Sequence, residues 1–170
     1  MDTRPFSPAC EKNKAPILEI LRGVMRHPGV VVEIGSGTGQ HAVYFARHLP
    51  HLTWHPTDRA AHLAGIQAWV THAALPNVVP PCPLDVLQSP WPLAYADYAF
   101  SANTTHIMSW QGVIALFHGV AALLPSGGFF CLYGPFNYNG QYTSESNAQF
   151  DAWLIARDPA SGIRDVDALQ

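Results

Sequence analysis

The chain has 170 residues, of which 48% are hydrophobic and only 12% are charged. This composition is too apolar for intrinsic disorder and too poor in charge for a long exposed coiled coil, and the length fits one compact domain over residues 1–170. The formal charge of -3 provides no general attraction to nucleic-acid phosphates or anionic lipids. We therefore expect no membrane partner and no clear nucleic-acid partner.

The cysteines and histidines predict neither a disulfide framework nor a metal site. Three cysteines lie far apart and form no C-x-x-C pair: Cys10, Cys82 and Cys131. His48, His51 and His55 share no common face, because prolines and a strand separate them. The start of the chain has no apolar run typical of a signal peptide, and no stretch approaches the ~18 apolar residues needed to cross a bilayer. We expect a protein of the reducing cytoplasm.

The first half of the chain predicts two units of strand and helix. A polar arm over residues 1–12 leads to a helix with Asn13 or Lys14 at its cap and Pro16 near its first turn. The β-branched run that follows, at 30–32, is typical of a strand buried on both faces. The elements predicted after it are a glycine loop at 35–39, a helix at 40–49, a strand from 52 that ends at Asp58 and a helix at 63–73.

The second half continues this alternation. Residues 77–84 predict only a weak strand, because Pro80, Pro81 and Pro83 each remove a hydrogen-bond donor and favour a sheet edge or an irregular segment. The remaining elements are a strand at 95–102, a helix at 110–124, a strand at 129–133 and a helix at 145–157. Strands that alternate with helices at this spacing predict right-handed βαβ units, so the expected fold class is α/β with a doubly wound, mainly parallel sheet.

Three glycines separate the first strand from the helix that follows, in Glu33-Ile34-Gly35-Ser36-Gly37-Thr38-Gly39. Without side chains, such a backbone can approach a ligand closely, and the helix N-terminus beyond it favours an anionic group. A dinucleotide fingerprint would require glycine or alanine at position 40, where the chain has Gln40. The pattern is instead E-x-G-x-G-x-G, with an acid two residues before the first glycine.

This pattern resembles motif I of class I S-adenosylmethionine-dependent methyltransferases, and the order of elements resembles that fold across nearly the whole chain. The resemblance is closest to a small methyltransferase-like family of unassigned substrate, through segments 7–9, 13–14, 33–41, 103–106, 133–137 and 162–165. It implies a Rossmann-like sheet of order 3-2-1-4-5 and S-adenosyl-L-methionine as cofactor. We expect the final antiparallel strand pair of that class to be missing.

The resemblance also implies a set of cofactor-binding residues. Gly35, Ser36, Gly37 and Gly39 would approach the methionine part, Glu33 its amino group, Asp58 both ribose hydroxyls, and Asp85 and Val86 the adenine edge. The alternative is that Asp58 caps the next helix and that Asp85 caps a turn. Three acids at three successive strand ends favour the cofactor interpretation.

The end of the strand at 95–102 provides the candidate catalytic residues, since open α/β sheets bind ligands at the carboxyl ends of their strands. Methyl transfer from a sulfonium mainly needs alignment and exclusion of water. Asn103 is predicted to orient a nucleophile and to contact the cofactor, and His106 to accept a proton. The alternative for His106 is an ordinary loop histidine.

Two further segments are expected beside the site. Residues 133–142 combine aromatics, amides and glycines in a way that suits a lid over a modest substrate, with a packed loop as the alternative. The predicted substrate-binding residues are Tyr133, Phe136, Asn137, Tyr142 and Arg164, of which Arg164 would hold a substrate carboxylate or pair with Asp165. The residues before Glu11 are expected over the cofactor cleft, with a disordered tail as the alternative.

The sequence thus predicts a cytoplasmic methyltransferase that acts on a small molecule or a presented side chain. The alternatives are a scaffold or sensor module that binds the cofactor without catalysis and, with less support, a nicotinamide-dependent oxidoreductase. The strand at 129–133 would be an apolar sheet edge without the usual lysines or prolines. We therefore expect either that the chain is part of a longer protein or that its own C-terminal segment or a second copy covers this edge, as a homodimer.

Overall fold

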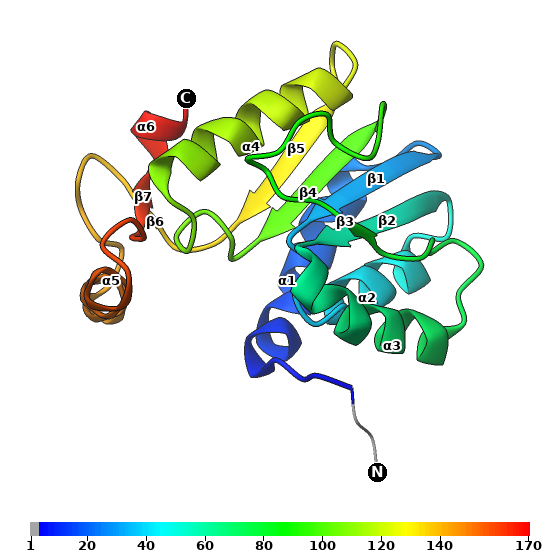
Figure 1. The fold of residues 1–170 in the computed structure, drawn as a ribbon, viewed down its shortest axis with the longest axis horizontal. Helices are drawn as coiled ribbons and strands as arrows, with labels where there is room; N and C mark the ends of the chain where they lie inside the picture. Colours follow the sequence, from blue (N-terminus) through cyan, green and yellow to red (C-terminus); the bar gives the residue numbers. More distant parts are fainter. Residues whose placement is uncertain (1–3) are drawn as a thin grey trace.

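A computed structural model describes residues 4–170, and its main feature is a five-stranded parallel sheet of order β3-β2-β1-β4-β5 (Figure 1). The strands are β1 (Gly29–Ile34), β2 (Leu52–Asp58), β3 (Cys82–Pro83), β4 (Tyr98–Ala102) and β5 (Phe129–Tyr133). The predicted fold class and strand order are both confirmed. The strand order reverses between β1 and β4, which is the place where open α/β sheets bind ligands.

Helices cover both faces of this sheet. One face carries α1 (Pro8–Val24), α2 (Gln40–His48) and α3 (Leu63–Ala73), with a short 3-10 helix, Ala60–His62, before α3. The other face carries α4 (Trp110–Leu123). Within residues 4–170, no helix is both long and apolar enough to cross a membrane.

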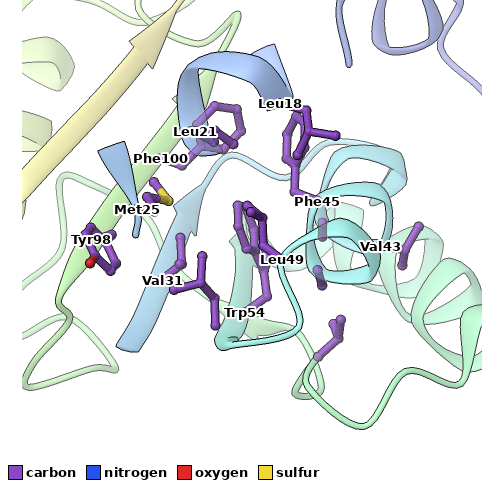
Figure 2. Close-up of a cluster of buried hydrophobic side chains, with 14 of the residues drawn as sticks. Leu18, Leu21, Met25, Val31, Val43, Phe45, Leu49, Trp54, Tyr98 and Phe100 are labelled. Atoms are coloured by element: carbon purple, nitrogen blue, oxygen red, sulfur yellow. The ribbon is translucent and has the colours of Figure 1, made fainter. Parts of the chain in front are cut away.

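The alternation of side chains along β1 explains the two cores. Val31 packs into the cluster under α1 and α2, whereas Val32 packs into the cluster under α4. The first cluster centres on Trp54, Phe45 and Phe100, whose rings lie 5.3 to 6.0 Å apart (Figure 2). The prediction of a strand buried on both faces is therefore confirmed.

The first helix begins earlier than the sequence analysis predicts, so the expected polar arm over 1–12 is wrong in its second half. Ser7 caps α1 by accepting a hydrogen bond from the Cys10 amide at 3.4 Å, and Pro8 occupies the first helical position. Pro16 lies inside the helix, where a proline normally interrupts the hydrogen-bond ladder. Burial of Ile17 and its apolar neighbours against the sheet keeps the helix intact despite this loss.

The prolines of the third strand have the predicted effect. β3 is reduced to two residues at the edge of the sheet, where Thr57 pairs with Cys82 and Asp58 with Pro83. No helix connects β3 to β4; an irregular segment does so, and its Trp91 packs beside α4. The short strand nevertheless brings Asp58 and Asp85 to the same edge of the sheet.

The C-terminal part forms a small unit of its own rather than an extension of the sheet. It consists of β6 (Phe136–Asn137), α5 (Glu145–Arg157), β7 (Arg164–Asp165) and α6 (Val166–Leu169), which lie together at one end of the molecule (Figure 1). β7 pairs in parallel with β6. Within residues 4–170, no strand pairs with the outer edge of β5. Coverage of this edge by the C-terminal segment, which was one expected alternative, therefore does not take the form of strand pairing. A second copy on this edge stays a prediction.

Candidate functional site

A cavity of about 920 Å³ opens at the carboxyl ends of the strands, beside the point where the strand order reverses. Its walls come from the chain before α1 and the first residues of α1, the ends of β1, β2 and β4 with the loops after β1 to β4, the first turns of α2, α3 and α4, and one residue of α5. The lining residues include Pro5, Ser7, Cys10, Gly35, Ser36, Gly37, His41, Asp58, Arg59, His62, Asp85, Val86, Asn103, Thr104, His106, Ile107, Met108 and Phe150. Most predicted cofactor residues and both predicted catalytic residues therefore share one cavity.

The glycine loop after β1 adopts a backbone that strongly favours glycine. Gly35, Gly37 and Gly39 have positive φ angles of 75°, 58° and 89°. A Cβ on Gly35 would lie 2.6 Å from the methyl group of Thr104, and one on Gly39 would lie 3.0 Å from the backbone of Ile66. A Cβ on Gly37 would meet no atom within 4 Å, so this glycine faces the open cavity, whereas Gly39 packs against α3.

Asp58 caps the following turn and also faces the cavity, so both predicted roles are compatible with its geometry. Its Oδ2 accepts a hydrogen bond from the Gly37 amide at 2.8 Å. Its Oδ1 accepts one from the Arg59 amide at 2.7 Å and lies 2.8 Å from Nδ1 of His62. Asp85 likewise accepts from the Leu87 amide at 3.0 Å and lines the cavity.

Glu33 lies beneath the glycine loop and does not line the cavity. It is 2% exposed, and its Oε2 accepts a hydrogen bond from Trp54 Nε1 at 2.9 Å. Burial raises the pKa of this carboxyl from its ordinary value to about 7, although the bond from Trp54 acts in the opposite direction. The predicted contact between Glu33 and the cofactor amino group therefore has no support in this geometry.

The start of the chain lies over the cavity. The Ser7 amide donates a hydrogen bond of 2.6 Å to Oε1 of Gln40, and Trp69 Nε1 donates one of 2.7 Å to the Pro5 carbonyl. The Arg4 guanidinium lies 4.1 Å from the centre of the Trp69 ring. Residues 4–7 are thus fixed against α2 and α3, while residues 1–3 lie outside the described part of the chain.

A neutral hydrogen-bonded group of three side chains closes the cavity near the start of α2. Cys10 Sγ lies 3.9 Å from Nδ1 of His41, and His41 Nε2 lies 2.7 Å from Oδ1 of Asn13. Burial lowers the pKa of His41 to about 4 and raises the pKa of the Cys10 thiol. At neutral pH the group therefore carries no charge. Among the residues that the structure describes, no group of three or more His, Cys, Asp or Glu side chains is placed to hold a metal ion.

The end of β4 and the loop after it are tied to the end of β1. Ser101 Oγ donates a hydrogen bond to the Ile34 carbonyl at 2.7 Å and lies 2.7 Å from Thr104 Oγ1. Asn103 has a positive φ of 58°, which asparagine tolerates better than most residues, and its amide donates to the Tyr133 carbonyl at 2.8 Å. Asn103 lines the cavity together with Asp58.

His106 is buried in the wall formed by this loop. Its ring lies 5.4 Å from the Phe150 ring in an edge-to-face arrangement, and its carbonyl accepts a hydrogen bond from the Gly162 amide at 2.9 Å. Nδ1 is buried without a hydrogen-bond partner among residues 4–170. Burial, assisted by the positive charge of Arg164, lowers the pKa of His106 to about 4. The imidazole is therefore neutral near pH 7 and can meet a ligand only through Nε2.

The five predicted substrate-binding residues do not line the cavity. Tyr133 ends β5 at the surface, Phe136 and Asn137 form β6, and the Tyr142 hydroxyl donates to Asp151 at 2.6 Å. The Arg164 guanidinium donates to the backbone carbonyls of Thr105, Met108 and Ala160. These residues lie outside the cavity wall, and their contact with a substrate stays a prediction.

Several cavity residues escape the sequence analysis. His41 lies in α2 just after the glycine loop, and His62 lies in the short 3-10 helix just after Asp58. Their short distance in sequence from these motifs could have indicated that they line the cavity. Phe150 gives none, because α5 reaches the cavity only through the packing of the C-terminal unit. Thr104 could have been found from its position in the loop after β4.

Comparisons with known proteins agree with this description. A sequence model of the family described as "Protein of unknown function (DUF938)" matches residues 4–170. An O-methyltransferase family protein from Burkholderia thailandensis superposes with a TM-score of 0.80 at 15% identity, over 95% of this chain and 49% of that one. The calicheamicin-biosynthesis methyltransferase CalO1 in its SAH-bound form gives 0.70 at 18% identity, over 93% and 46%.

The mitomycin 7-O-methyltransferase MmcR gives a TM-score of 0.78 at 14% identity, over 95% of this chain and 46% of that one. The chain thus spans about half the length of these three structures. At such low identities the likeness establishes the fold, which is that of the class I methyltransferases.

Proposed function

The chain belongs to the DUF938 family, and we propose that it is an S-adenosylmethionine-dependent methyltransferase. The observation that carries the proposal is the joint position of Gly37 and Asp58. The Gly37 amide donates to the Asp58 carboxylate at 2.8 Å, and the same glycine leaves space on its cavity side. A carboxylate beside a glycine turn, at the end of the neighbouring strand, suits a ribose diol next to a backbone-bound amino acid.

The cavity also fits the remainder of the cofactor. Asp85 and Val86 lie at the end of the neighbouring strand, where an adenine ring would lie. The first turn of α2 begins at Gln40, and a helix N-terminus favours a carboxylate such as that of methionine. The SAH-bound state of CalO1 supports this assignment through the common fold.

When bound, S-adenosylmethionine supplies an electrophilic methyl group on a sulfonium leaving group. The residues of this chain need only hold the acceptor in line with it and exclude water. Asn103, which the hydrogen bond from its amide to the Tyr133 carbonyl holds at the end of β4, would position the acceptor. His106 lines the cavity, is neutral and has its Nδ1 buried, so it would receive a proton at Nε2 as the new bond forms.

Calorimetric titration with S-adenosylhomocysteine tests the proposal. We expect micromolar binding by the parent protein and binding weaker by roughly 10- to 100-fold for Asp58→Ala, because charge-assisted hydrogen bonds are lost. Asp97→Ala is the matched control, since the Asp97 carboxylate also accepts a backbone hydrogen bond, from the Val30 amide at 2.7 Å, but does not line the cavity.

Each result of this titration has a distinct meaning. Failure of the parent protein to bind would contradict the proposal. Equal binding by the parent and Asp58→Ala would return Asp58 to a purely capping role. Binding without methyl transfer to any acceptor would instead favour a scaffold or sensor.

A further inference from the structure

The charged residues of the cavity wall lie in one half of it. Asp58, Arg59 and Asp85 follow β2 and β3, in the half that suits the cofactor. The other half is formed by the loop after β4, the start of α4 and Phe150, and none of its lining residues carries a charge at neutral pH. Whatever binds beside the cofactor therefore meets uncharged walls.

The cation nearest to this uncharged half is already engaged. The Arg164 guanidinium donates to the carbonyls of Thr105, at 3.2 Å, and Ala160, at 2.9 Å, and also to that of Met108. It lies 5.8 Å from the centre of the Trp110 ring. An acidic ligand would therefore lack a free positive partner among the described residues of this half, and a basic ligand would lack a carboxylate.

Aromatic and aliphatic surface dominates the same half. The Phe150 ring is held by two ring contacts, an edge-to-face contact with His106 at 5.4 Å and a stacked contact with Trp153 at 5.9 Å. Met108 and Ile107 complete this wall, and Ile107 is 56% exposed at the cavity rim. Such a surface favours a flat apolar ring, which can pack against Phe150 without losing solvation of a charge.

Asn103, Thr104, Ser109 and His106 provide the polar groups of this half, and of these four His106 is the one with a ring nitrogen that can accept a proton. Because Nδ1 of His106 is buried, Nε2 is the ring nitrogen left to meet a ligand. Burial keeps the His106 ring neutral, so Nε2 can accept a hydrogen bond from a hydroxyl group of the acceptor. The ring needs to take up the hydroxyl proton only late in the reaction.

We propose that the methyl acceptor is an uncharged aromatic molecule with a hydroxyl group, whose ring packs on Phe150 and whose hydroxyl meets Nε2 of His106. The volume of about 920 Å³ is near the upper end of the about 300–1,000 Å³ typical of ligand pockets, which leaves room for a small ring beside the cofactor. The inference rests on the methyltransferase function proposed above and adds the class of its acceptor.

The proposed transfer is balanced in atoms and electrons. A bond forms between the hydroxyl oxygen and the methyl carbon, the bond between that carbon and the sulfonium sulfur breaks, and its electron pair stays on sulfur. The hydroxyl proton passes to Nε2 of His106 and then to water. A weak base suffices, because the oxygen becomes a strong acid as it gains the methyl group.

A panel of three matched phenols tests the acceptor class. The members share one hydroxylated ring and carry a methyl ester, a free carboxylate or a protonated amine at the same position. A trideuteromethyl-labelled donor and mass spectrometry identify the products, and calorimetry with S-adenosylhomocysteine is run on the same preparation. We expect O-methylation of the ester with kcat/KM at least about tenfold above that of either charged phenol.

Two variants sharpen the panel. Ile107→Lys adds a cation at the rim and should shift the preference toward the carboxylate by about tenfold or more. Ile114→Lys is the matched control, because Ile114 is 43% exposed on α4 and does not line the cavity, and it should leave the preference unchanged.

Three outcomes would overturn the inference. They are preference of the parent protein for either charged phenol, no transfer to any of the three phenols while S-adenosylhomocysteine binds normally, and the same preference in Ile107→Lys as in the parent. Loss of S-adenosylhomocysteine binding would instead contradict the methyltransferase proposal itself.

Discussion

The two halves of the cavity are built in different ways. The cofactor half is formed after β1, β2 and β3, and the acceptor half is formed by the loop after β4, the start of α4 and Phe150. In the cofactor half, the loop after β1 is held by backbone hydrogen bonds, such as those from the Gly35 and Ser36 amides to the Thr57 carbonyl at 3.0 and 2.9 Å. In the acceptor half, buried His106 Nδ1 has no hydrogen-bond partner among residues 4–170, and the His106 ring packs edge-to-face on Phe150 at 5.4 Å. The first half is thus organised by backbone hydrogen bonds between the ends of neighbouring strands, and the second by side-chain packing between distant segments.

A substitution at Gly37 should affect the cofactor half most strongly. In Gly37→Val, a β-branched side chain would occupy a φ of 58° and extend into the open cavity. We expect binding of S-adenosylhomocysteine, measured by calorimetry, to weaken by at least about 100-fold, which is about 3 kcal/mol.

Gly23→Val provides a control, because this helical glycine also has free space around it but lies outside the cavity. It should bind like the parent protein. Unchanged affinity in a folded Gly37→Val would place the ligand elsewhere.

Glu33→Gln separates a structural acid from a ligand-binding one. Because the folded-state pKa of Glu33 is raised from 4.5 to about 7, its ionisation destabilises the fold progressively as pH rises from about 4.5 to about 7. The free energy of unfolding of the uncharged variant should therefore equal that of the parent protein near pH 4. At pH 8 it should be higher than that of the parent by up to about 3 kcal/mol. Urea titrations at both pH values would measure the difference.

The affinity of Glu33→Gln for S-adenosylhomocysteine should change only a few-fold, because Glu33 lies outside the cavity wall. A loss of binding without a gain in stability would restore the role in cofactor binding that the sequence predicts.

The arm over the cofactor half should contribute to binding more than to folding. Removal of residues 1–6 leaves the helix cap at Ser7 but deletes the contacts of Arg4 and Pro5 with Trp69. We expect about tenfold weaker binding of S-adenosylhomocysteine, as one anchored wall of the cavity is lost, and a melting temperature within a few degrees of the parent. Equal binding would mean that the arm is only a tail.

The smallest effect concerns pH and the acceptor half. With the pKa of His106 lowered to about 4, kcat/KM for the acceptor should be flat from pH 6 to 8 and fall only as the pH approaches 4, where the imidazole becomes protonated. A solvent-exposed histidine base would instead give an inflection near its ordinary value of about 6.5. Such an inflection in the parent protein, if absent in His106→Gln, would contradict the burial of the His106 ring.

The cofactor half could be predicted in large part because glycines and strand-end acids impose their geometry within a few residues. Glu33 is the instructive exception. Alternation along β1 places it on the same face as Val31, under α1 and α2, whereas Ile34 reaches the cavity. The resemblance of the motif indicated a ligand contact, although the period of the strand already indicated burial.

The acceptor half could be predicted only at its centre. Asn103 and His106 follow directly from the end of β4, but Phe150 reaches the cavity through the packing of α5. Arg164 has the chemistry of a carboxylate-binding residue, yet its guanidinium donates to carbonyls of the loop after β4. Such competition between a ligand and the backbone for one side chain depends on tertiary contacts that sequence spacing does not contain.

A crystal structure with S-adenosylhomocysteine bound would test the central claim most directly. We predict both ribose hydroxyls within hydrogen-bond distance of Asp58, the amino-acid part along Gly35 to Gly37, and the sulfur open toward Asn103 and His106. A ligand bound outside this cavity, or inside it with the ribose away from Asp58, would contradict the account.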